Sequence, residues 1–145
     1  FVKDAADNSA MYKYTIWNLD NSVPRIGTIA VTDKIENGQA VGWNITVPAD
    51  DVSAKTGTSG SGIKGYAITK SSVMNAPDTC QTGDTLFTPV SGKYRIWVYD
   101  NAENISYKDV NITSDVTYNG KSLRGMDYDG KSLTYIMYNG KRLRL

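Results

Sequence analysis

The most informative stretch of this 145-residue sequence is Val98-Tyr99-Asp100-Asn101-Ala102-Glu103-Asn104. It resembles Val2-Lys3-Asp4-Ala5-Ala6-Asp7-Asn8, and each position is offset by the same 96 residues. In both copies a strand would end in a turn rich in Asp and Asn. The side chains of these residues hydrogen-bond the local backbone, and Asn also tolerates positive φ. The match predicts a tandem array with a repeating unit of about 96 residues.

This repeat also predicts how the chain is divided. We expect residues 1–19 to be the last strands of a preceding unit, residues 20–24 to be a linker, and residues 25–113 to be one whole unit. Residue 1 would then be a cut within a longer chain. Apolar and polar side chains alternate with a period of two, as in residues 41–47, and turn-rich stretches separate such runs. The pattern predicts an all-β fold, an antiparallel β-sandwich.

A shorter repeat occupies residues 114–145. The pattern apolar-x-Tyr-Asx-Gly-Lys-x-Leu occurs three times with a period of ten residues, with its tyrosines at Tyr118, Tyr128 and Tyr138. Asn-Gly and Asp-Gly favour two-residue type I′ hairpin turns, which would pair each Tyr with the Lys that follows it. A single short hairpin is marginal in water. We therefore expect this tail of hairpins to pack on itself, on the sandwich or on a second chain.

The composition excludes several kinds of chemistry. The sequence has no histidine and one cysteine, so it cannot form a Ser-His-Asp triad, a Cys-His dyad, a His-ligated metal site or an internal disulfide. Its 16 basic and 15 acidic residues give no net field toward nucleic acid or anionic membranes. No apolar run approaches the roughly 18 residues of a membrane span. We expect no enzymatic activity, no cofactor, no nucleic-acid binding and no membrane insertion.

Four acidic residues are candidates for binding calcium. Asp50 and Asp51 are adjacent in a loop, and Asp100 and Glu103 lie in the repeated turn. Ca²⁺ takes about six to eight oxygen ligands, so either pair would contribute to a calcium site at a domain junction or loop. The interpretation that we favour is structural, with these residues in solvated loops and turns where they cap backbone groups.

Five aromatic residues are candidates for binding a partner: Trp97, Tyr99, Tyr118, Tyr128 and Tyr138. Trp97 and Tyr99 fall on the face of their strand opposite the expected core, where an exposed ring would stack on a sugar or anchor a protein. The interpretation that we favour for these two rings is a second packed face or a domain junction. The three repeat tyrosines would form a ladder for a glycan or, as we favour, hold the hairpins together.

Two motifs resemble those of bacterial immunoglobulin-like domains. Residues 98–106 resemble the V-x-D-x-A-G-N-x-S hairpin between the last two strands of such domains, and Ser59-Gly60-Ser61-Gly62-Ile63-Lys64-Gly65-Tyr66 is similar to their S-G-I-x-x-Y strand start. This resemblance implies an immunoglobulin-like β-sandwich. The family has Gly where this chain has Asp7 and Glu103, a departure that argues against a simple left-handed turn and adds a carboxylate.

The ten-residue repeat resembles the C-terminal Y-N-G-K repeats of phage tail and structural proteins, and of some surface proteins, from Gram-positive bacteria. Together the resemblances imply a structural and attachment module of a phage virion, in a tail, fibre or head appendage. Its partners would be other virion or surface proteins, with a homo-oligomer formed through residues 114–145. The alternative is a bacterial cell-surface adhesin module that binds a host glycan or a protein. In a third hypothesis, residues 1–19 complete a neighbouring subunit by strand addition.

Overall fold

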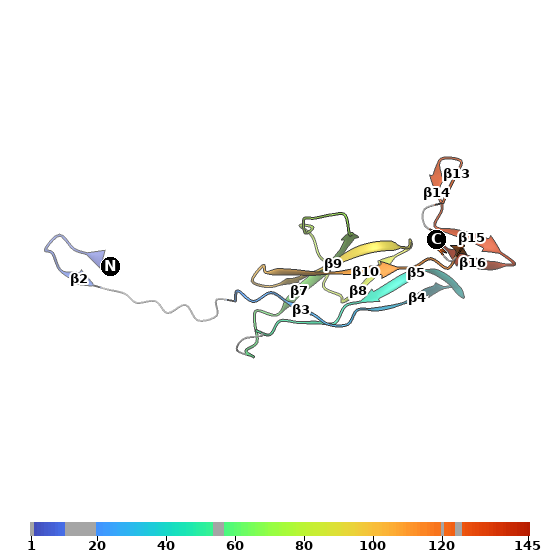
Figure 1. The fold of residues 1–145 in the computed structure, drawn as a ribbon. Coiled ribbons are helices and arrows are strands. Elements are labelled where there is room, and N and C mark those ends of the chain that lie inside the picture. Colours follow the sequence, from blue (N-terminus) through green and yellow to red (C-terminus); the bar gives the residue numbers. More distant parts are fainter. Residues whose placement is uncertain (1, 11–19, 54–56, 120, 124–125) are drawn as a thin grey trace.

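The structure, a computed structural model, describes residues 2–10, 20–53, 57–119, 121–123 and 126–145. Within these ranges every regular element is a β-strand, and the strands pair antiparallel (Figure 1). The predicted all-β fold is therefore confirmed. The segment 11–19, in which we expected a strand of a preceding unit, lies outside the described residues.

The central sandwich consists of two three-stranded sheets and a short strand pair. Its strands are β3 (Arg25–Ile26), β4 (Ala30–Glu36), β5 (Gln39–Thr46), β6 (Ala49–Asp50), β7 (Ile63–Lys70), β8 (Thr85–Thr88), β9 (Gly92–Asp100) and β10 (Ile105–Ile112). One sheet has the order β4-β5-β8 and the other β10-β9-β7, while β3 pairs with β6. The two sheets and the strand pair together form the antiparallel β-sandwich that the period-two alternation predicted.

The core lies between these two sheets. Ile45 and Val47, at the end of β5 and just beyond it, are completely buried, as are Ile96 and Val98 of β9. Within each pair the residues are two positions apart, and alternate side chains of a strand point to the same face of the sheet. The other buried members of this cluster are Trp43, Tyr66, Leu86, Tyr94 and Ile112. The alternation read from residues 41–47 therefore identifies the core face of β5.

The repeated stretch forms the same turn in both copies. Between β1 (Val2–Lys3) and β2 (Ser9–Ala10), Asp4 accepts hydrogen bonds from the backbone N–H and the side-chain amide of Asn8, both at 2.9 Å. After β9, Asp100 accepts the same two hydrogen bonds from Asn104, both at 2.7 Å. The sequence match therefore reflects a shared local structure.

The expectation that this turn departs from left-handed geometry is wrong. Asp7 has φ 68° and Glu103 has φ 69°. The backbone N–H of each donates to the carbonyl of the aspartate three positions earlier, at 3.1 Å and 3.3 Å. These closing hydrogen bonds impose the left-handed backbone even though a residue with a Cβ costs about 1–2 kcal/mol there.

The tail forms the three predicted hairpins. They pair β11 (Thr117–Tyr118) with β12 (Lys121–Ser122), β13 (Asp127–Tyr128) with β14 (Lys131–Ser132), and β15 (Tyr135–Tyr138) with β16 (Lys141–Arg144). In each hairpin the repeat tyrosine is paired with the repeat lysine, as the type I′ turn predicts. Asp129 and Asn139 have the positive φ that this turn requires, 50° and 48°. The segment 124–125, between the first two hairpins, lies outside the described residues.

Arg144 anchors the last hairpin to the sandwich and is only 5% exposed. Its Nε and Nη2 donate to the two carboxylate oxygens of Asp115, at 2.7 and 2.8 Å. The same side chain reaches Asp33 at 2.9 Å and the carbonyl of Gly42 at 2.6 Å, and its guanidinium lies over the ring of Trp43. The hairpin is therefore attached through a buried arginine as well as through apolar contact.

The two attachments of the sandwich lie at opposite ends (Figure 1). The linker reaches β3 at one end, and β16 packs beside β5 at the other. There the carbonyl of the fully buried Leu145 accepts a 2.8 Å hydrogen bond from the N–H of Ser91. This arrangement gives the described chain a linker pole and a tail pole.

Candidate functional site

Three aspartates meet at the linker pole. Asp20 belongs to the linker, Asp51 follows β6 directly, and Asp100 is the last residue of β9. Each provides a carboxylate oxygen, and these oxygens all lie within 4.8 Å of one another. Asp51 is 7% exposed and Asp100 is fully buried. Within the described ranges, none of the three forms an ion pair with a Lys or Arg.

Loop backbones and one amide side chain hold this acidic cluster together. The N–H of Ser61 donates to Oδ2 of Asp20, and the N–H of Gly62 donates to Oδ2 of Asp51, both at 2.7 Å. The side-chain amide of Asn104 donates to the carbonyl oxygen of Asp20 at 3.2 Å. Three segments that are distant in the sequence therefore converge at the cluster: the linker, the loop before β7 and the turn after β9.

Asp20 is the most accessible of the three. Hydrogen bonds from the backbone of Ser61 and then of Ser22 hold the pKa of its carboxyl below the ordinary value. Asp20 therefore carries a full negative charge at neutral pH, next to two aspartates that are shielded from water.

Asp51 is held in a confined position with one oxygen left over. Its Oδ2 accepts from Gly62 and from the hydroxyl of Ser61, but its buried Oδ1 has no hydrogen-bond partner among the described residues. A Cβ on Gly60 would lie 2.5 Å from both carboxylate oxygens. Only glycine at position 60 leaves room for this carboxylate.

The structure separates the four acidic residues that the sequence singled out. Asp51 and Asp100 come together in the cluster. Asp50 instead forms an exposed ion pair with Arg25 at 2.8 Å, because neighbouring strand residues point to opposite faces. The side chain of Glu103 is 85% exposed. Asp20, which completes the cluster, had no distinguishing local pattern in the sequence.

Trp97 and Tyr99, the two candidate binding residues on β9, are buried and not exposed to a partner. Trp97 is 4% and Tyr99 is 7% exposed, and both pack with Ala67, Ala76 and Cys80 in a second apolar cluster. The segment between β7 and β8 covers this outer face of the sheet, and its Pro77 carbonyl accepts a 2.6 Å hydrogen bond from the Tyr99 hydroxyl. The favoured interpretation, a second packed face, is the arrangement that these two rings adopt.

The repeat tyrosines are more open. Tyr128 is 75% exposed and Tyr138 is 65% exposed, while the side chain of Tyr118 lies outside what the structure describes. Neither Tyr128 nor Tyr138 is buried within its own hairpin. These two rings therefore remain accessible to a partner.

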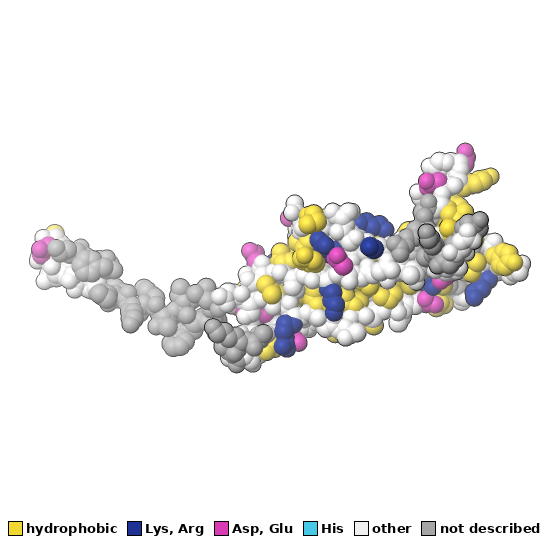
Figure 2. All heavy atoms as spheres, in the orientation of Figure 1, with side chains coloured by type: hydrophobic (Ala, Val, Ile, Leu, Met, Phe, Trp, Pro, Cys, Tyr) yellow, Lys and Arg dark blue, Asp and Glu magenta, His cyan; other side chains and the backbone are white. Residues whose placement is uncertain are grey.

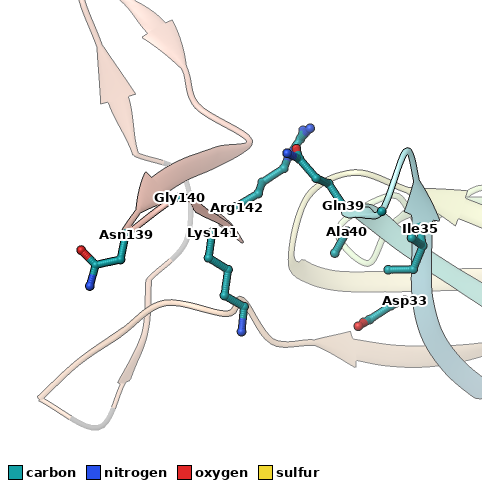
Figure 3. Close-up of a pocket in the computed structure, with 9 residues that line it drawn as sticks. Asp33, Ile35, Gln39, Ala40, Asn139, Gly140, Lys141 and Arg142 are labelled. Carbon is teal, nitrogen blue, oxygen red and sulfur yellow. The ribbon is translucent and has the colours of Figure 1, made fainter.

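A groove of about 410 Å³ separates the last hairpin from the sandwich. Figure 3 shows Asn139 and Lys141 on the hairpin side, and Ile35 and Gln39 from the β4–β5 hairpin on the other side. Arg142 also lines it, with its guanidinium carbon 3.8 Å from the ring centroid of Tyr135. The groove is thus lined by charged, polar and apolar side chains.

Comparison with known proteins identifies no relative: no protein-family model, curated protein or solved structure matches the chain. In the part of the chain that the structure describes, no helix has the length and apolar character that crossing a membrane requires.

Proposed function

We propose that this chain is a non-enzymatic structural and attachment module of a phage virion, where it acts as a spacer and an assembly contact. It would belong to a tail, a fibre or a head appendage, and its partners would be other virion proteins and further copies of itself. The observation that carries the proposal is the shared turn of the two repeat copies, since it supports a chain built from successive units of one kind.

The position of the attachments supports the spacer role. The linker lies at one pole of the sandwich and the docked tail at the other (Figure 1). Sandwiches joined through these two poles would therefore add to the length of a fibre. The Asp4 and Asp100 turns are alike in hydrogen bonding and in backbone conformation, as expected for adjacent copies of one repeating domain.

The tail supports the role in assembly. Tyr128, Met137 and Tyr138 are 75%, 54% and 65% exposed, and Figure 2 shows apolar side chains at the outer parts of the C-terminal hairpins. Exposed aromatic and Met side chains are enriched in protein interfaces. The hairpins therefore offer a surface through which copies of the chain would associate.

The mass of the chain in solution tests this proposal. Light scattering with size-exclusion chromatography is expected to show a homo-oligomer for the full chain. Replacing Tyr128, Met137 and Tyr138 together by serine should give a monomer with an unchanged circular-dichroism spectrum. Met74→Ser, which removes a 75% exposed apolar side chain from the sandwich, is the matched control and should leave the mass unchanged. A wild-type monomer at all concentrations would contradict the role of the tail.

A second candidate function is a surface adhesin module that binds a host glycan. The groove favours it, because Gln39, Asn139 and Arg142 place hydrogen-bonding groups around one cavity, and polar groups of this kind orient sugar hydroxyls. A glycan array probed with the wild type and with Gln39→Ala and Arg142→Ala separates the two candidates. Binding that is lost in both variants would favour the adhesin, and no binding by the wild type would exclude this version of it.

A further inference from the structure

We propose that Asp20, Asp51 and Asp100 bind one Ca²⁺ ion, which fixes the linker to the sandwich. The inference concerns ion binding by the chain itself and is independent of the virion proposal.

The spacing fits a single ion. Ca²⁺ lies about 2.3–2.6 Å from its oxygen ligands, so two ligands on opposite sides of it are at most about 5 Å apart. The three carboxylate oxygens lie within 4.8 Å of one another. This spacing is compatible with one ion that contacts all three carboxylates. The clustered oxygens, with no nitrogen or sulfur ligand, match the hard cations and not zinc or copper.

The charge of the cluster requires compensation. Carboxylates this close repel one another, and burial strengthens the repulsion because water does not screen it. Backbone N–H groups of Ser61 and Gly62 supply part of the compensation. Across the described residues no Lys or Arg is paired with the cluster. A divalent cation would supply the positive charge that the side chains lack.

The unpartnered oxygen is the independent observation that points to a ligand. Buried polar atoms almost always have a hydrogen-bond partner, and an unpartnered one calls for an ion or a water. Among the described residues Oδ1 of Asp51 is such an atom, on a side chain that is more than nine-tenths buried. The other oxygen of the same carboxylate is satisfied by the loop. This division leaves one oxygen free to coordinate a metal.

The ion would act on the linker. Asp20 is the only member of the cluster that belongs to the linker, whereas Asp51 and Asp100 belong to the sandwich. Coordination by all three would therefore restrict how the linker leaves the sandwich.

Calorimetric titration and thermal unfolding of the full chain test the proposal. After removal of metal with EDTA, titration with CaCl₂ is expected to show one ion bound per chain. Adding CaCl₂ at about 10 mM should raise Tm by roughly 5 °C or more, because a ligand that binds only the folded state stabilises it by mass action. Mg²⁺ at the same concentration should give a smaller rise, since it demands stricter octahedral geometry.

Matched variants locate the site. Asp51→Asn and Asp20→Asn should each reduce the calcium-dependent rise in Tm at least threefold, and Asp20→Asn changes the more accessible of the two side chains. Asp50→Asn, adjacent in sequence but paired with Arg25 on the other face, should respond like the wild type. A wild type without a calcium response would overturn the proposal, as would an undiminished response in Asp20→Asn or an equal response to Mg²⁺.

Discussion

The guanidinium carbon of Arg144 lies 4.1 Å from the ring centroid of Trp43, which joins the end of the tail to a central strand of the sandwich. Trp43 is itself a member of the core, at 5% exposure. A cation over an aromatic face is attracted by the negative charge of the ring surface, and more strongly where water is excluded. This contact makes the last hairpin part of the folded domain.

Replacing Arg144 should therefore weaken the docking of the tail. We expect Arg144→Met to lower the free energy of unfolding by about 1–3 kcal/mol, because it leaves Asp115 and the Gly42 carbonyl without their charged partner. Urea unfolding followed by tryptophan fluorescence measures the change. Arg25→Met is the control: its 2.8 Å ion pair with Asp50 is more than half exposed, so its loss should cost under about 1 kcal/mol. Equal effects of the two variants would contradict the assigned role of Arg144.

The stability conferred by the ion pair between Arg144 and Asp115 should depend on pH. Hydrogen bonds from Arg144 hold the pKa of Asp115 below its ordinary value. A carboxyl with a lowered pKa in the folded state stabilises the fold above its unfolded pKa of about 3.9, and this contribution disappears as the pH falls through the lower folded value. We expect the urea midpoint to fall on acidification below about pH 5, and to fall less steeply in Asp115→Asn. Parallel pH profiles of the two proteins would be evidence against the linkage.

The left-handed turn at Glu103 provides a stabilising substitution. Glu103→Gly should raise the free energy of unfolding by roughly 0.5–1 kcal/mol, since glycine removes the steric cost at φ 69° but adds entropy to the unfolded chain. The exposed contact with Lys64 at 4.0 Å is too weak to offset this gain. Glu36→Gly, in the ordinary backbone of β4, should instead destabilise the protein. Thermal unfolding of both variants checks the sign, and a destabilised Glu103→Gly would show that the turn is not strained.

The features that can be predicted well are those set by residues close together in the sequence. The Asn-Gly and Asp-Gly pairs encode positive φ directly, so the register of Tyr138 with Lys141 follows from two residues. Period-two alternation identifies which side chains of β5 and β9 face the core. It does not indicate what covers the opposite face. Burial of Trp97 depends on the path of the segment between β7 and β8, which has no periodic pattern.

The acidic cluster depends on topology. The segment between β6 and β7 begins with Asp51, and β9 ends at Asp100 where the turn to β10 begins, so both residues lie at the same end of the sandwich. Asp20 joins them because the linker enters at the same pole. An assigned strand order would therefore have predicted the cluster, whereas local motifs grouped Asp51 with Asp50. Arg144 gives no local signal either, since it contacts Gly42 across 102 positions.

The packing of the segment between β7 and β8, which covers the outer face of the β10-β9-β7 sheet, should depend on Gly65. A Cβ at this position would lie 2.6 Å from both the Cys80 sulfur and the Gln81 carbonyl oxygen, so Gly65→Ala must push the covering segment away from β7. We expect a loss of about 1–3 kcal/mol of stability, with faster modification of Cys80 by a thiol reagent as Trp97 and Tyr99 become accessible. Gly83→Ala is the matched control in the same segment, because its Cβ would have only an ordinary 3.7 Å contact with Gln81. Unchanged thiol reactivity in Gly65→Ala, measured under native conditions, would show that close packing at Gly65 does not hold the cover in place.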